Sequence, residues 1–124
     1  MTDTQPVPPA PARPTVVTLP TEFDMGNAAG IHNEITAAFA RGPRVVVADM
    51  TATTFCDTMA IRALVLAHRQ AATNDTELRL AVSAPGVLRI MEVLGVDAML
   101  PIYHSLEEAL AGHRVTTAES SGTA

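Results

Sequence analysis

The sequence is poor in the residues that several kinds of function require. It has no tryptophan, no lysine and one cysteine among 124 residues, and aromatic residues make up only 3%. Few aromatic rings leave little on which nucleic-acid bases can stack. A formal net charge of −5 also opposes binding to a phosphate backbone, which needs a basic surface. We therefore expect a protein that binds no nucleic acid.

Long hydrophobic runs and disulfide-forming cysteine pairs are missing too. No apolar stretch approaches the roughly 18 residues of a membrane span, and the start of the chain has no apolar segment typical of a signal peptide. A lone cysteine fits a reducing compartment. We expect a soluble cytoplasmic protein without membrane insertion. Its eight basic residues are all arginine, which, with many alanines and prolines, indicates a GC-rich bacterial genome.

The composition divides the chain into three parts. Residues 1–14 hold five prolines and are expected to form an extended, flexible tail. Residues 113–124 are small and polar and are interpreted as a second flexible tail. Hydrophobic residues make up 48% of the whole chain, which is enough for the intervening residues 15–112 to form one domain with an aliphatic core.

Strand-like and helix-like patterns alternate along this domain. Continuous or alternating apolar runs predict strands at 15–19, 44–50, 77–83 and 99–102. Helical spacing predicts helices at 27–40 and 58–73, a third from Pro85 to Gly95, and a fourth that starts with the capping box Ser105-x-x-Glu108. Asn27 is the expected N-cap of the first helix. The order β-α-β-α-β-α-β-α predicts an α/β domain with a largely parallel sheet.

The helical stripes also predict a core. We expect these side chains to face the sheet: Ala28, Ile31, Ile35, Ala38 and Phe39; Ala60, Ala63, Leu64, Ala67 and Ala71; Val87, Ile90, Met91 and Leu94; Leu106, Ala109 and Leu110.

One segment resembles the signature of the STAS domain family. It reads Phe55-Cys56-Asp57-Thr58-Met59-Ala60-Ile61 and joins a predicted strand to a predicted helix. Further likenesses lie in the same order as in that family: Glu22-Phe23-Asp24, Asp49, Val93-Leu94-Gly95-Val96, Tyr103 and residues 105–109. The resemblance covers about residues 15–111. It implies a STAS-like fold, with a four- to five-stranded, mostly parallel (mixed) sheet packed with about four helices.

The best-known branch of that family consists of anti-sigma-factor antagonists, so the resemblance implies a regulatory binding protein and not an enzyme. The implied partner is an anti-sigma-factor serine/threonine-protein kinase of histidine-kinase-like ATPase fold, and a sigma factor is affected indirectly. The unphosphorylated antagonist holds the kinase, and the phosphorylated one releases it. ATP is then the kinase's cofactor, and none is expected in this chain.

Carried over to this sequence, the phosphorylated hydroxyl is that of Thr58. Asp24, Asp57, Met59 and Arg62 are expected beside it on the partner-binding surface. A helix N-terminus has unpaired N–H groups and a partial positive charge that suit a phosphate. A second reading remains open, in which Asp57 or Thr58 is simply the N-cap of the helix. Two positions depart from the family pattern: Met59 replaces its second Ser/Thr and Ala60 replaces its Gly.

Two other functions compete with this one. Cys56-x5-Arg62 has the spacing of a cysteine phosphatase, although Asp57 beside the thiol would raise its pKa and repel phosphate, so a structural cysteine is favoured. The changes at Met59 and Ala60 leave open a STAS-like subunit that docks on a membrane transport ATPase/permease system. The four histidines show no paired ligand spacing, so no metal site is predicted.

Overall fold

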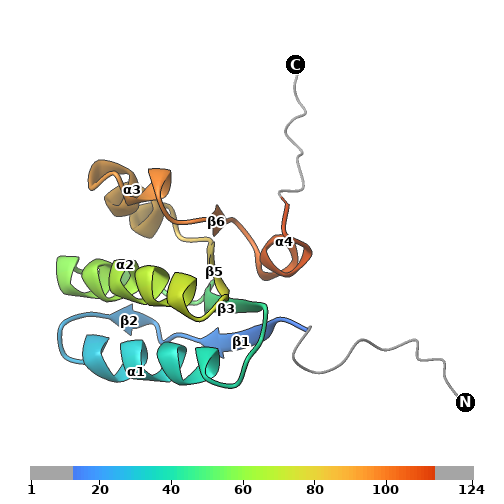
Figure 1. Cartoon of the computed structure of the whole chain (residues 1–124). Coiled ribbons are helices and arrows are strands. Elements are labelled where there is room, and N and C mark those ends of the chain that lie inside the picture. Colours follow the sequence, from blue (N-terminus) through green and yellow to red (C-terminus); the bar gives the residue numbers. More distant parts are fainter. Residues whose placement is uncertain (1–12, 114–124) are drawn as a thin grey trace, which may run out of the picture.

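The computed structural model describes residues 13–113, so most of both predicted tails lies outside the described residues. A four-stranded, fully parallel sheet forms the centre of the domain, in the order β1-β3-β5-β6. Figure 1 shows the helices arranged around it. The strands of this sheet are β1 (Thr15–Thr18), β3 (Val45–Met50), β5 (Glu77–Val82) and β6 (Ile102–Tyr103).

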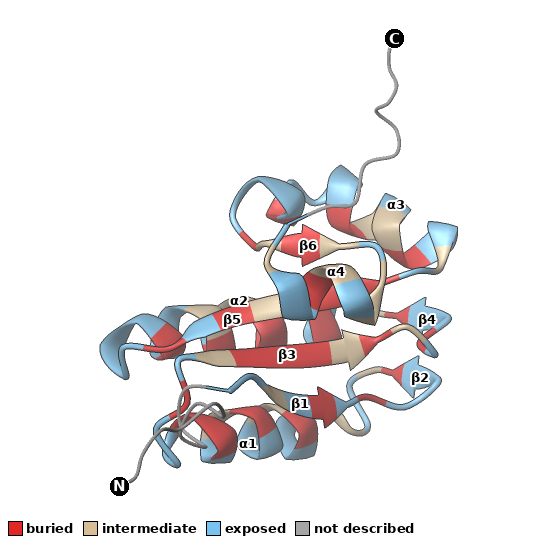
Figure 2. Cartoon of the chain, turned by 90° about the vertical axis from the view of Figure 1, so that its right-hand side faces the viewer, coloured by how far each residue is buried: buried red, intermediate tan, exposed pale blue. Residues whose placement is uncertain are grey.

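Helices cover both faces of the sheet, as the continuous apolar strands require. The helices are α1 (Ala28–Phe39), α2 (Thr58–Thr73), α3 (Pro85–Val93) and α4 (Leu106–Ala111). One face of β3 and β5 joins the main core with α1, α2 and α3, whereas Val47 and Ala81 point to the opposite face and contact Ala109 of α4. Figure 2 shows the buried strands between these two layers. The predicted α/β class and the largely parallel sheet are confirmed.

A second, very short parallel ladder was not predicted. It joins β2 (Glu22–Phe23) to β4 (Phe55–Cys56), with Glu22 opposite Phe55 and Phe23 opposite Cys56. Two-residue strands are too short to produce a hydrophobic period, so the sequence gives no signal for them. The ladder matters because it brings the loop before α1 to the start of α2.

The two longest helical predictions are accurate. Helix α2 has the predicted bounds, and α1 is one residue shorter at each end than expected. All ten side chains predicted to face the core from these two helices are buried. Pro85 opens α3, and Gly95 follows it with a left-handed backbone at φ 77°. Ser105 caps α4 by accepting a hydrogen bond from the Glu108 N–H at 3.1 Å.

Three predictions near the C-terminal end are wrong. Met99 is not in a strand: it follows a short 3-10 helix, η2 (Val96–Ala98), and is 50% exposed. Leu94 and Leu110 are exposed although both were expected in the core. Leu94 stands one residue beyond α3, where the chain turns away at Gly95. The short α4 buries a single residue, Ala109, which leaves the neighbouring Leu110 in solvent.

The two leucines of α2 provide a direct test of this packing. Leu64 is fully buried against the sheet and Leu66 is 40% exposed on the outer side of the same helix. We expect Leu64→Ala to lower the free energy of unfolding by about 2–5 kcal/mol, because it leaves a cavity in the core. Leu66→Ala should change it by less than about 1 kcal/mol. Urea unfolding followed by circular dichroism measures both, and equal losses would contradict the arrangement.

Candidate functional site

The site lies where β2 and β4 meet, at the carboxyl end of the central sheet. The loop from β3 to β4 is fixed there by Thr53, which is fully buried and donates its hydroxyl to the Pro20 carbonyl oxygen at 2.8 Å. The Thr54 N–H donates to the Thr21 carbonyl at 2.9 Å. These contacts hold two segments together that lie more than 30 residues apart in sequence. Sequence reasoning missed Thr53, because nothing local distinguishes a buried threonine from a loop threonine.

Asp57 connects the two segments directly. One of its carboxylate oxygens accepts the Ala60 N–H at 2.9 Å and so caps α2. The other oxygen accepts the Met25 N–H at 2.8 Å, from the loop before α1. The N-cap reading of Asp57 is therefore confirmed, and the same carboxylate has a second task that the sequence did not indicate.

The hydrogen bonds to Asp57 also act on its charge. The Ala60 N–H contributes most to holding the pKa of this carboxyl below its ordinary value, and the Met25 and Met59 N–H groups act in the same direction. Desolvation of the carboxylate opposes them and is second in size to the effect of the Ala60 N–H. Donors that point at a carboxylate favour its ionised form. Asp57 is thus a fixed negative charge next to the first residue of α2.

Asp24 organises the loop before α1. Its carboxylate accepts the Gly26 N–H at 2.9 Å, and its own N–H donates to the Asn27 side-chain oxygen at 3.0 Å. Asn27 stands at the N-cap position of α1, as predicted, but its side chain makes no capping hydrogen bond. That side chain points back instead and donates to the Glu22 carbonyl at 2.8 Å. Asn27 is therefore the N-cap residue of α1 by position, and its amide orders the loop before the helix.

The other predicted site residues project from the first two turns of α2. Thr58 is the first residue of the helix and is exposed. Met59 is 48% exposed, and Arg62 lies one turn further along, also exposed. The five predicted residues, Asp24, Asp57, Thr58, Met59 and Arg62, are thus brought to one end of the fold. The N–H of Met25, the residue after Asp24, bonds to Asp57 and links the two groups.

Two apolar side chains beside this group were not predicted as part of the site. Met25 is 75% exposed and Phe55 is 50% exposed. Met25 belongs to the loop that Asp57 holds, and Phe55 lies two residues before Asp57 on β4. Both side chains therefore add apolar surface next to the five predicted residues.

Cys56 does not meet the requirement of a phosphatase nucleophile. Its side chain is buried, and burial, followed by the negative charge of Asp57, raises the pKa of the thiol to about 12. A thiol with that pKa is protonated at neutral pH, whereas the attacking species is the thiolate. Within residues 13–113, no three histidine, cysteine or acidic side chains are grouped so that they could hold a metal ion.

Comparisons with known proteins identify the family of the chain. The STAS domain model matches residues 5–109, and the chain therefore belongs to the STAS domain family. A comparison with curated protein sequences gave no significant match. No helix in the described part of the chain is both long and apolar enough to cross a membrane.

Solved structures of the same fold come from two functional settings. An anti-sigma factor antagonist from Mycobacterium paratuberculosis superposes with a TM-score of 0.73 at 25% identity, covering 80% of this chain and 84% of the other. A putative anti-sigma factor antagonist from Thermotoga maritima gives 0.69 at 16% identity, covering 78% and 86%. A sulfate transporter family protein from Wolinella succinogenes gives 0.68 at 16% identity, covering 86% and 87%.

The hydrogen bonds of Asp57 predict an acid-dependent loss of stability. The pKa of this carboxyl is lower in the folded chain than its unfolded value of about 3.9. The stabilisation of the fold by the ionised Asp57 is therefore fully present above that unfolded value, and it is lost as the pH falls through the folded pKa. Asp57→Asn should have a lower thermal midpoint than wild type at pH 7. The difference should shrink as the pH falls to about 2–3, because the wild-type carboxylate is then protonated.

Thermal unfolding followed by circular dichroism between neutral and acid pH measures this difference. Asp97→Asn on η2 removes an exposed carboxylate of the same kind and serves as the control. A gap between wild type and Asp57→Asn that stays constant with pH would show that the carboxylate is not held by these N–H groups.

Proposed function

We propose that this chain is an anti-sigma-factor antagonist that binds an anti-sigma-factor serine/threonine-protein kinase and is switched off by phosphorylation of Thr58. The observation that supports this most strongly is the Asp57 bridge, which holds the first turn of the long helix α2, where Thr58 stands exposed. The similar structure from Mycobacterium paratuberculosis is described as an anti-sigma factor antagonist, which supports the same assignment. Regulation of sigma-factor-dependent transcription follows from that role.

The switch needs no catalytic group in this chain. Phosphorylation adds about −1.5 to −2 charge at pH 7. The helix N-terminus offers a positive dipole end to that charge, so the fold tolerates it. A partner surface that covers Thr58 must desolvate the same charge beside the ionised Asp57, which opposes binding. The modification therefore changes the affinity and leaves the fold unaltered.

The surrounding residues have distinct parts in this proposal. Met59 supplies apolar contact area next to Thr58, and the Asp24 loop supplies a rigid edge whose polar groups are already paired within the loop. A loop that is ordered before binding loses little entropy on docking. The kinase, of histidine-kinase-like ATPase fold, brings the ATP, and the sigma factor is freed when the kinase is held here.

A second candidate is a subunit that docks on a membrane transport ATPase/permease system. The similarity to the sulfate transporter family protein supports the use of this fold in such a setting. Met59 and Ala60, which replace a hydroxyl residue and a glycine of the family pattern, fit a member that is not phosphorylated. Neighbouring genes for a switch kinase and a sigma factor, or for a permease and its ATPase, separate the two candidates.

Incubation with the candidate kinase and ATP tests the first proposal. We expect mass spectrometry to find one phosphate on wild type and none on Thr58→Ala, because no other residue combines this hydroxyl with the start of α2. Thr54→Ala, which removes an exposed threonine four residues away, should still be phosphorylated. Thr58→Glu should weaken kinase binding by about tenfold or more. Equal phosphorylation of wild type and Thr58→Ala would refute the site.

A further inference from the structure

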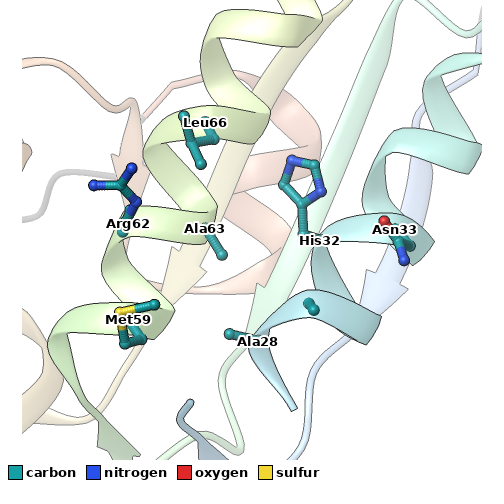
Figure 3. A pocket seen from close by; sticks show the side chains of 8 residues that line it. Ala28, His32, Asn33, Met59, Arg62, Ala63 and Leu66 are labelled. Atoms are coloured by element: carbon teal, nitrogen blue, oxygen red, sulfur yellow. The ribbon is translucent and has the colours of Figure 1, made fainter. Parts of the chain in front are cut away.

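A shallow apolar groove runs between α1 and α2, beside the Thr58 site. Its volume is about 250 Å³. Ala28 and His32 line it from α1, and Met59, Arg62, Ala63 and Leu66 line it from α2. Figure 3 shows these side chains along the two neighbouring helices. The alanines allow the groove to form, since they leave the space that larger side chains would fill.

The shape of the groove matches a helical segment. Its lining residues on α2 lie at positions i, i+3, i+4 and i+7, from Met59 to Leu66. Seven residues of helix rise about 10 Å, which is about two turns. Met59 and Leu66 are 48% and 40% exposed at the two ends of this stripe. Two apolar side chains spaced by two turns are suited to anchor an amphipathic helix laid along them.

The charges around the groove specify its occupant further. The chain has a net charge of −5, yet no carboxylate lines the groove. Helix α2 has no acidic residue along its whole length, and its charged side chains are arginines. Arg62 forms no ion pair or hydrogen bond with any residue among 13–113. An unpaired guanidinium at the rim of an apolar groove favours a partner with a carboxylate, which it can bind through two hydrogen bonds.

Arg62 also lies one turn after Thr58. Side chains at positions i and i+4 of a helix are neighbours, with about 5–6 Å between their Cβ atoms. A phosphate on Thr58 is therefore within reach of the Arg62 guanidinium. The same cation cannot pair fully with a phosphate on its own helix and with a carboxylate of a docked segment.

We infer that the α1–α2 groove anchors an amphipathic helix of the partner that carries apolar side chains and a carboxylate, and that phosphorylation of Thr58 withdraws Arg62 from that carboxylate. This inference rests on the proposed function, because it names where and how the proposed partner binds. Phosphorylation then acts twice: it places charge at the edge of the interface, and it removes the cation that the groove presents.

Isothermal titration of the full chain with the purified kinase tests the groove. We expect Leu66→Asp and Arg62→Glu each to raise the dissociation constant by about tenfold or more. Arg44→Glu makes the same charge change before β3, at the opposite end of the sheet, and should alter the constant by less than about threefold. All three residues are exposed, and circular dichroism confirms that each variant is folded.

The outcomes separate this inference from the proposed function. If wild type binds and Thr58→Glu does not, while both groove variants bind like wild type, the switch stands and the groove is not the anchor. If wild type does not bind the kinase, both proposals fail. If the groove variants change only the self-association of the chain in light scattering, the occupant is a second copy and the inference is wrong.

A second measurement tests whether the Arg62 guanidinium pairs with the phosphate on Thr58. On the phosphorylated chain, a pH titration followed by phosphorus NMR gives the second pKa of the Thr58 phosphate, which is about 6 without a partner. We expect it to be lower in wild type than in Arg62→Gln, because a neighbouring cation favours the dianion. Equal phosphate pKa values in the two proteins would show that Arg62 does not pair with the phosphate. That result would refute the withdrawal of Arg62 from the partner, whatever the groove variants show.

Discussion

The Asp57 carboxylate makes the contact on which the arrangement of the candidate site depends. It accepts N–H groups from the first turn of α2 and from the loop before α1, two segments that meet only in the folded chain. These donors also lower the pKa of the carboxyl, so the negative charge beside Thr58 persists to lower pH than for a free aspartate.

This bridge is possible because the fold supplies a rigid frame for it. The parallel order β1-β3-β5-β6 places the carboxyl ends of its strands along one edge of the sheet. The short ladder of β2 and β4 continues from that edge and brings Phe23 opposite Cys56. Buried Cys56 then belongs to the packing under the site, and its protonated thiol plays no part in the chemistry proposed here.

Much of the fold could be predicted from the sequence because its strongest elements have clear periods. Helix α2 has a buried apolar stripe from Ala60 to Ala71, so both its bounds and its buried side could be predicted. The errors concern short elements. The exposed Leu94 and Leu110 follow from helices that end early or contact the sheet through one residue, which no local pattern reveals.

The candidate site, too, could be predicted only in part. Its five residues do gather at one end of the fold, but the contact that joins them, from the Met25 N–H to Asp57, spans 32 positions and involves a backbone group. Backbone donors have no sequence signature. The exposure of Met25 and Phe55, and the groove beside α2, likewise depend on how the helices pack and could not be predicted from residue type.

In the proposed switch, a phosphate on Thr58 is tolerated by the fold and not by a docked partner. Amide proton–nitrogen NMR spectra of the phosphorylated and unmodified chain show how far the effect of the phosphate reaches into the fold. We expect shifts confined to the start of α2 and the loop around Met25, with the amides of β3 and β5 unchanged. Shifts spread through those central strands would mean that the modification alters the fold itself, and would refute a switch that acts only on the docked partner.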